Sequence, residues 1–117
     1  MAAIGGFFSQ VLLGSVDDGL LVLGERARYA LYYHIEKSYL VKREQIPDRI
    51  AEFHEALEKI FHDGCRVVEK LIARSLYQKL ALSFEEHKEW TLVDYVNAAK
   101  DHASNSERVL RVGVELN

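Results

Sequence analysis

One short segment of the chain carries the residue types from which a nucleophilic site is built. It reads Phe61-His62-Asp63-Gly64-Cys65-Arg66 and places a histidine three residues before the only cysteine. A thiol in the first turn of a helix lies near the positive end of the helix dipole, which lowers its pKa, and a nearby histidine can act as its base. A cysteine nucleophile normally takes its histidine from a distant part of the chain, however, and no local signature of a cysteine hydrolase surrounds Cys65. We therefore predict a protein with no catalytic residues that is not an enzyme.

The histidines do not have the spacing of a metal site. No His-x3-His or Cys-x2-Cys pair is present, and the five histidines fall on five different segments: His34, His54, His62, His87 and His102. His54 and Glu58 stand four residues apart, but an isolated pair of this kind is typical of a surface contact. The glycines also lack the spacing of a phosphate-binding loop. The sequence therefore predicts no metal and no cofactor.

Basic residues recur along the segment that follows Asp63-Gly64. Arg66, Lys70 and Arg74 stand at four-residue steps, after a tight turn between two predicted helices, and this arrangement superficially resembles a helix-turn-helix. The preceding helix is acidic, the whole chain has a formal charge of -3, and the basic helix also carries a strong apolar stripe. DNA binding through these three residues is therefore the alternative function, and nucleic acid is not the favoured partner.

An apolar stripe near the N-terminus predicts an interface. Residues 3–13 have the spacing of a short amphipathic helix, and its apolar side consists of Ile4, Phe7, Phe8, Val11 and Leu12. Such a stripe either covers the domain's own core or binds a second subunit, and both apply in an intertwined homodimer. We expect a homodimer, with a protein partner in signalling as a further expectation.

Composition restricts the architecture to one domain. The chain has 117 residues, of which 49% are hydrophobic, enough for a single buried core. One cysteine cannot form an internal disulfide, which favours a cytoplasmic protein. The uncharged run 1–13 has no basic segment before it and is followed by Asp17 and Asp18, so we expect neither a signal peptide nor a membrane span.

The hydrophobic periodicity predicts an all-α fold, a compact bundle of four to five helices. Besides residues 3–13, we expect the longest helix over residues 20–39, capped by Asp17 or Asp18, and further helices over 50–61, 65–81 and 92–103. Pro47 and Asp48 mark the start of the third helix, and Asp63-Gly64 its end. A capping box at Ser83 predicts a short helical turn, and Thr91 is a second, weaker cap signal. The domain thus divides into an N-terminal helix (1–15), a core (18–103) and an irregular tail (104–117), which is either extended or a frayed helix.

Several short segments together resemble a known family. They are Leu23-Gly24-Glu25, Leu31-Tyr32-Tyr33-His34-Ile35-Glu36, Ile46-Pro47, Phe53-His54-Glu55-Ala56-Leu57, Ile60-Phe61, Gly64 and Glu69-Lys70. Over residues 18–100 the chain resembles an uncharacterised archaeal helical family, the Nitrosopumilus-type output domain of archaeal signalling proteins. The resemblance implies an archaeal source, a helical fold and a role downstream of a sensor. The chain departs from the family pattern at His62 and Cys65, which further disfavours catalysis, and the family supplies no site residues. We therefore predict a non-enzymatic helical module for protein interaction or signalling output.

Overall fold

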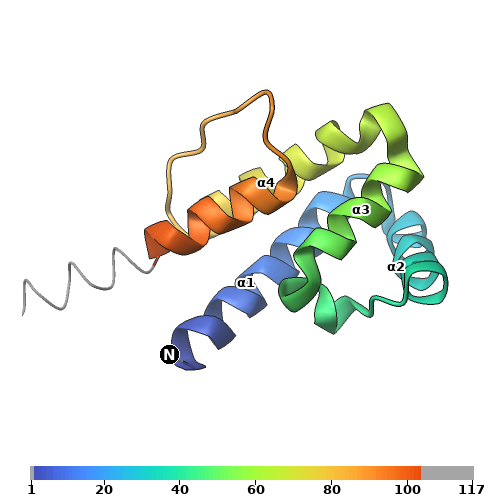
Figure 1. Cartoon of the computed structure of the whole chain (residues 1–117), viewed down its shortest axis with the longest axis horizontal. Coiled ribbons are helices and arrows are strands. Elements are labelled where there is room, and N and C mark those ends of the chain that lie inside the picture. The colour runs from blue at the N-terminus through green and yellow to red at the C-terminus, as the bar shows by residue number, and fades with distance from the viewer. Residues whose placement is uncertain (1, 104–117) are drawn as a thin grey trace, which may run out of the picture.

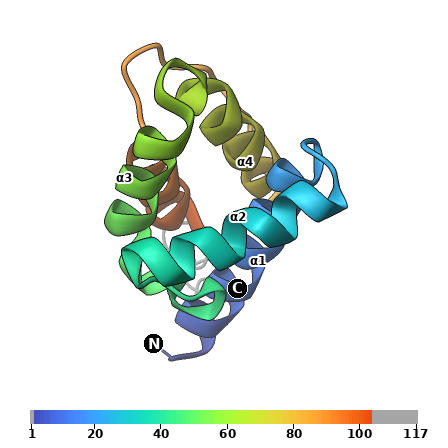
Figure 2. The ribbon, with the colours of Figure 1, turned by 90° about the vertical axis from the view of Figure 1, so that its right-hand side faces the viewer.

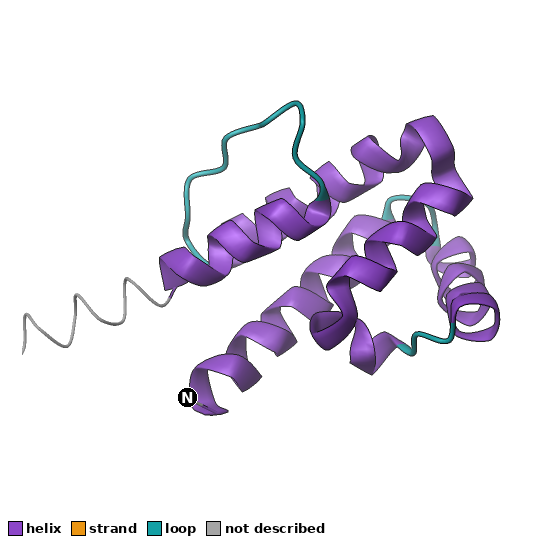
Figure 3. Cartoon of the chain, in the orientation of Figure 1, coloured by secondary structure: helices purple, strands orange, loops and turns teal. Residues whose placement is uncertain are grey.

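The computed structural model describes residues 2–103, and the regular structure within this range is entirely helical (Figures 1 and 3). In chain order the elements are α1 (Ala2–Leu21), α2 (Glu25–Tyr39), the 3-10 helix η1 (Arg43–Arg49), α3 (Ile50–Phe61), the 3-10 turn η2 (His62–Gly64), α4 (Cys65–Lys79) and a helical segment over residues 92–103. The predicted all-α bundle is confirmed. The predicted tail over residues 104–117 lies outside the described residues.

The central contact of the fold is the antiparallel pairing of α1 with α4. Asp18 near the end of α1 accepts a hydrogen bond from Ser75 (3.1 Å) and forms an ion pair with Lys79 (2.9 Å), both in the second half of α4. At the next residue of α1, a Cβ atom on Gly19 would lie 2.5 Å from Cγ1 of Ile72 and 3.0 Å from the Ile72 backbone. The two helices therefore approach this closely only because residue 19 has no side chain.

The core is lined by side chains at helical spacing. From α1, Phe8, Leu12, Val16 and Leu20 are buried at four-residue steps and face one side of the helix. Buried residues from α3, α4 and the 92–103 helix complete the core: Phe53, Ala56, Leu57, Val68, Ile72, Leu76, Leu92, Val96 and Ala99. Figure 2 shows α2 lying across the other helices, and only Leu31 and Ile35 of α2 are buried.

The first two helices differ from the prediction at their boundary. The sequence predicted a short helix ending at residue 13 and a long one over residues 20–39, but α1 continues to Leu21 and α2 begins at Glu25. The chain turns at Gly24, whose φ of 103° is easily reached only by glycine. Packing against α4 keeps the helix intact through Gly14 and Gly19, and Asp17 accepts hydrogen bonds from Tyr32 and Arg43 instead of capping a helix. Tertiary contacts thus outweigh local propensity here.

The second boundary lies near Pro47, where the prediction was partly correct. Pro47 and Asp48 lie within η1, and α3 begins at Ile50 without Asp48 as its cap. The turn between α3 and α4 was placed correctly, but its positive φ falls on His62 (51°), whereas Gly64 has a φ of -79°. Gly64 therefore does not adopt the left-handed conformation that the sequence predicted for it.

A loop joins α4 to the 92–103 helix, and one of its two predicted caps is wrong. Residues 82–87 contain no helical turn, so the capping box at Ser83 does not form. The Thr91 signal is correct, because the Asp94 carboxylate accepts a hydrogen bond from the Thr91 backbone N–H (2.9 Å) where the helix begins. Figure 1 shows this loop projecting from the bundle.

Candidate functional site

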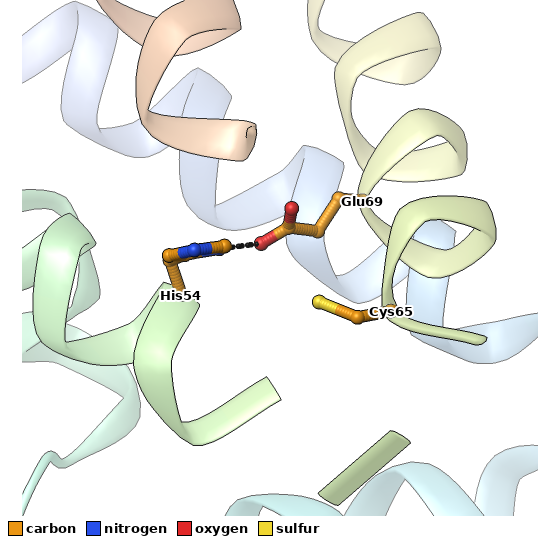
Figure 4. A group of neighbouring side chains, drawn as sticks. All are labelled: His54, Cys65 and Glu69. Carbon is orange, nitrogen blue, oxygen red and sulfur yellow. Dashed lines mark hydrogen bonds and ion pairs between the residues drawn. The ribbon is translucent and has the colours of Figure 1, made fainter. Parts of the chain in front are cut away.

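Three side chains with different donor atoms converge between α3 and α4. His54 comes from the first half of α3, and Cys65 and Glu69 stand at i and i+4 on one side of α4, one turn apart. One nitrogen, one sulfur and one oxygen from this set all lie within 4.8 Å of one another. Figure 4 shows the three side chains pointing toward a common centre. We refer to His54, Cys65 and Glu69 as the triad.

Glu69 is the most deeply buried member of the triad, with an exposed fraction of 1%. Its Oε2 lies 2.5 Å from Nδ1 of His54, and its Oε1 accepts a hydrogen bond from the Leu92 backbone N–H (3.1 Å). Leu92 is in the first turn of the 92–103 helix, where the helix dipole favours negative charge. The carboxylate therefore joins three helices and has a partner on each oxygen.

His54 connects the triad to the surface. Its second ring nitrogen, Nε2, lies 3.7 Å from Oε1 of Glu58, a side chain that is 59% exposed. The pair that the sequence indicated as a surface contact is thus present, but the shorter contact of His54 is with the buried Glu69. The ring faces a carboxylate on each side.

Cys65 does not have the properties of a nucleophile. Its side chain is buried, and burial, followed by the negative charges of Glu69 and Glu58, raises the pKa of its thiol to about 12. The lowering by the helix dipole that the sequence suggested is outweighed by these effects. His62, the predicted base, is exposed at the turn while the thiol faces the interior. The geometry therefore gives His62 and Cys65 no shared site.

The contact between His54 and Glu69 was not predicted from the sequence, because no spacing rule connects the two residues. They stand 15 residues apart on two helices, and only the reversal of the chain at residues 62–64 brings them together. One signal was present in the sequence: Glu69 interrupts the apolar stripe of the 65–81 segment between Val68 and Ile72. A charged residue within a buried stripe requires a partner.

The basic residues of α4 contact the loop that follows it. Arg66 donates a hydrogen bond to the Lys88 carbonyl, and Lys70 forms an ion pair with Glu86 at 3.2 Å. The guanidinium of Arg74 lies over the Phe84 ring, 5.2 Å from its centroid. The stripe that suggested phosphate contacts thus holds the loop in place in this structure.

The N-terminal stripe is divided between core and surface. Phe8 and Leu12 are buried in the chain's own core, one of the two alternatives left open by the sequence. Val11 is half-buried, Phe7 is 64% exposed, and the side chain of Ile4 lies outside what the structure describes. This stripe therefore offers a partner much less surface than its composition suggested.

A larger apolar surface lies on the outer side of α2. Tyr29 and Tyr33 are 63% and 66% exposed. Val22 before the helix and Leu40 at its C-terminal end are 68% and 72% exposed. We call Tyr29, Tyr33 and Leu40, together with Arg26 and Glu36 on the same side of the helix, the α2 face.

Comparisons with family models, with curated proteins and with solved structures find no match to this chain. The resemblance to the archaeal output domain thus stays a prediction. None of the described helices has the length and apolar character needed to cross a membrane. Function must therefore be argued from the triad and the α2 face themselves.

Proposed function

We propose that the protein is a non-enzymatic helical interaction module, and that it pairs with a second copy of itself through the α2 face. The observation that carries the proposal is the exposure of both tyrosines on this face, since large aromatic side chains are enriched in interfaces. A role in signalling output belongs to the same proposal and is supported by the family resemblance of residues 18–100.

The α2 face is self-complementary about residue 31. Tyr29 and Tyr33 each lie two residues from this position, and Arg26 and Glu36 each lie five. If two copies of α2 pack antiparallel around a twofold axis at residue 31, each Tyr29 faces Tyr33 of the other copy. The same register places Arg26 opposite Glu36 of the other copy, so opposite charges meet at both ends.

The C-terminal end of the face is apolar, because Leu40, the residue that ends α2, lies nine residues from position 31 and is 72% exposed. Within residues 2–103 neither Arg26 nor Glu36 forms an ion pair, so both are available to a partner. Alternating three- and four-residue steps separate the residues of the face: Arg26, Tyr29, Tyr33, Glu36 and Leu40. This is the spacing found in helices that pack side by side.

The size of the face indicates a weak dimer. A helix of 15 residues is about 22 Å long, and one pair of such helices buries less area than the roughly 1,600 Å² of a standard interface. We therefore expect dissociation in the micromolar range or above, with the monomer predominating in dilute solution.

Sedimentation equilibrium over a wide concentration range tests the proposal. The Arg26→Glu and Glu36→Arg variants each place like charges opposite one another, and each should weaken the dimer. The double variant Arg26→Glu/Glu36→Arg restores opposite charges and should restore association. Phe7→Asp is the control, because Phe7 is 64% exposed but lies on the N-terminal stripe and not on the α2 face.

Two outcomes would contradict the proposal. One is a monomer at every concentration up to the millimolar range. The other is a dimer that Phe7→Asp disrupts and that is insensitive to both charge reversals. The second outcome would place the interface on the N-terminal stripe that the sequence indicated first.

A further inference from the structure

We propose that the triad of His54, Cys65 and Glu69 binds a divalent transition metal ion, with Zn²⁺ as the ion that fits best. This inference is independent of the α2 face, with which the triad shares no residue. It also reverses an expectation from the sequence, which offered no ligand pair with the spacing of a metal site.

The donor set selects the metal class. Imidazole nitrogen, thiolate sulfur and carboxylate oxygen together are a borderline-soft set that suits Zn²⁺ and its neighbours in the first transition row. Mg²⁺ and Ca²⁺ prefer ligand sets made of oxygen alone. With three protein ligands, one position of a tetrahedral ion remains for a water molecule.

The distances require only small movements. Ligand atoms about 2.1 Å from a tetrahedral ion lie about 3.4 Å from one another. The nitrogen, sulfur and oxygen atoms of the triad already lie within 4.8 Å of one another, and the shortest pair, Nδ1 of His54 and Oε2 of Glu69, lies at 2.5 Å. An ion between these two atoms needs them to separate by about 1 Å, and the His54 side chain, which is 14% exposed, is the member of the pair that reaches the surface.

The surroundings of the triad match those of known metal ligands. A ligating histidine commonly donates its other ring N–H to a carboxylate, and Nε2 of His54 already faces Glu58. The Leu92 backbone N–H holds Oε1 of Glu69 and leaves Oε2 directed at the centre of the triad. Glu69 is thus oriented by a hydrogen bond, and His54 has a carboxylate 3.7 Å from its second nitrogen.

A bound cation is compatible with the burial of the triad. Each oxygen of the Glu69 carboxylate already has a polar partner, Nδ1 of His54 or the Leu92 backbone N–H. A divalent ion between Glu69 and His54 would replace the first of these contacts with metal–ligand bonds. On binding, the Cys65 thiol loses its proton to solvent and its sulfur becomes a ligand. The proton between Nδ1 of His54 and Oε2 of Glu69 must also leave this position so that both atoms can ligate, and Nε2 then carries the ring proton.

Cobalt titration of the metal-free full chain tests this site directly. Tetrahedral Co²⁺ with a thiolate ligand gives a charge-transfer band in the near-ultraviolet and strong bands in the visible. We expect one Co²⁺ per chain with both features, and displacement of Co²⁺ by an equivalent of Zn²⁺. Absence of stoichiometric binding to the wild-type protein would overturn the proposal.

Variants then assign the ligands. Cys65→Ser should abolish the charge-transfer band, and Glu69→Gln should weaken binding by at least 100-fold. Glu58→Gln should weaken it by about 10- to 100-fold, the usual effect of removing the carboxylate behind a ligating histidine. His62→Gln is the matched control, because His62 is exposed at the adjacent turn, and it should leave the titration unchanged. A charge-transfer band that survives in Cys65→Ser would refute the assignment.

A measurement on the wild-type chain does not depend on whether the variants fold. A ligand that binds only the folded state raises the midpoint of thermal unfolding. Zn²⁺ at a tenfold excess should therefore raise this midpoint, and Mg²⁺ at the same concentration should not. Equal effects of the two ions, or no effect of Zn²⁺, would show that the triad is a hydrogen-bonded core network without a metal.

Discussion

Gly19→Ala is expected to destabilise the protein although it places a better helix former in α1. Alanine is favoured over glycine by about 1 kcal/mol in a helix interior. Against this, the new Cβ would lie 2.5 Å from Cγ1 of Ile72 and 3.0 Å from its Cα and N. The side chain of Ile72 can rotate, but its backbone cannot, so α1 and α4 must move apart. Overpacking of this kind costs about 1–3 kcal/mol, and because backbone atoms are involved we expect a net loss of about 1–2 kcal/mol.

Gly14→Ala, five residues earlier in α1, provides the control. The nearest atom to a Cβ at Gly14 is Cε of Lys79 at 3.9 Å, an ordinary contact with a flexible side chain. Here the helix propensity acts alone and should stabilise the protein by up to about 1 kcal/mol. Urea unfolding followed by circular dichroism measures both variants. If Gly19→Ala is as stable as Gly14→Ala, then α1 and α4 do not approach each other as closely at Ile72 as the structure indicates.

Three further outcomes follow from the contacts described. The rise in the pKa of Cys65 from 9.0 to about 12 lowers its thiolate fraction at neutral pH about 1,000-fold. A thiol reagent should therefore label the native chain far more slowly than the chain unfolded in urea. Equal labelling rates would show that the thiol is exposed. Burial alone raises the pKa of Asp17, but hydrogen bonds from Arg43 and Tyr32 outweigh it and lower the pKa below 3.8. The stability that the ionised Asp17 contributes is present above its unfolded pKa and is lost as the pH falls through the folded value. Because solvent partly screens the pair with Arg43, Asp17→Asn should cost about 1 kcal/mol at pH 7. The difference in stability should narrow below about pH 4, and a constant difference would contradict the bond network. Filter binding at low salt should show no retention of duplex DNA, because Arg66, Lys70 and Arg74 contact the loop between α4 and the 92–103 helix. Salt-sensitive retention would favour the DNA-binding alternative.

The third and fourth helices could be predicted from the sequence because their periodicity agrees with their burial. Phe53 and Leu57 in α3, and Val68, Ile72 and Leu76 in α4, are apolar at helical spacing and all are buried. In α1 the same periodicity continues from Phe8 to Leu20, but Gly14, Asp17 and Asp18 obscured it. These residues favour a break in an isolated chain, and only the contacts with α4 and with Arg43 reverse that preference.

The candidate sites could be predicted less well because each depends on how separate elements meet. Cys65 was identified from its position at a helix start, but its partners are His54 and Glu69 and not the adjacent His62. The basic stripe was read correctly as three residues on one side of a helix, yet its role depends on a loop whose path the sequence did not indicate. Aromatic residue type alone did not indicate that Tyr29 and Tyr33 lie at the surface, because their exposure follows from the placement of α2 at the edge of the bundle.

The α2 face and the triad differ in what they contribute to the fold, and this decides how each proposal can be tested. Only two residues of α2 are buried, and Arg26 and Glu36 are not among them. A charge reversal at either position removes no core contact, so a change in association can be read directly as a change at the interface. Each triad residue, in contrast, lies in or beside the core, and its replacement changes packing as well as metal binding. The wild-type response to Zn²⁺ against Mg²⁺ is therefore the decisive measurement for the triad, whereas the restored association of the double charge reversal is decisive for the dimer.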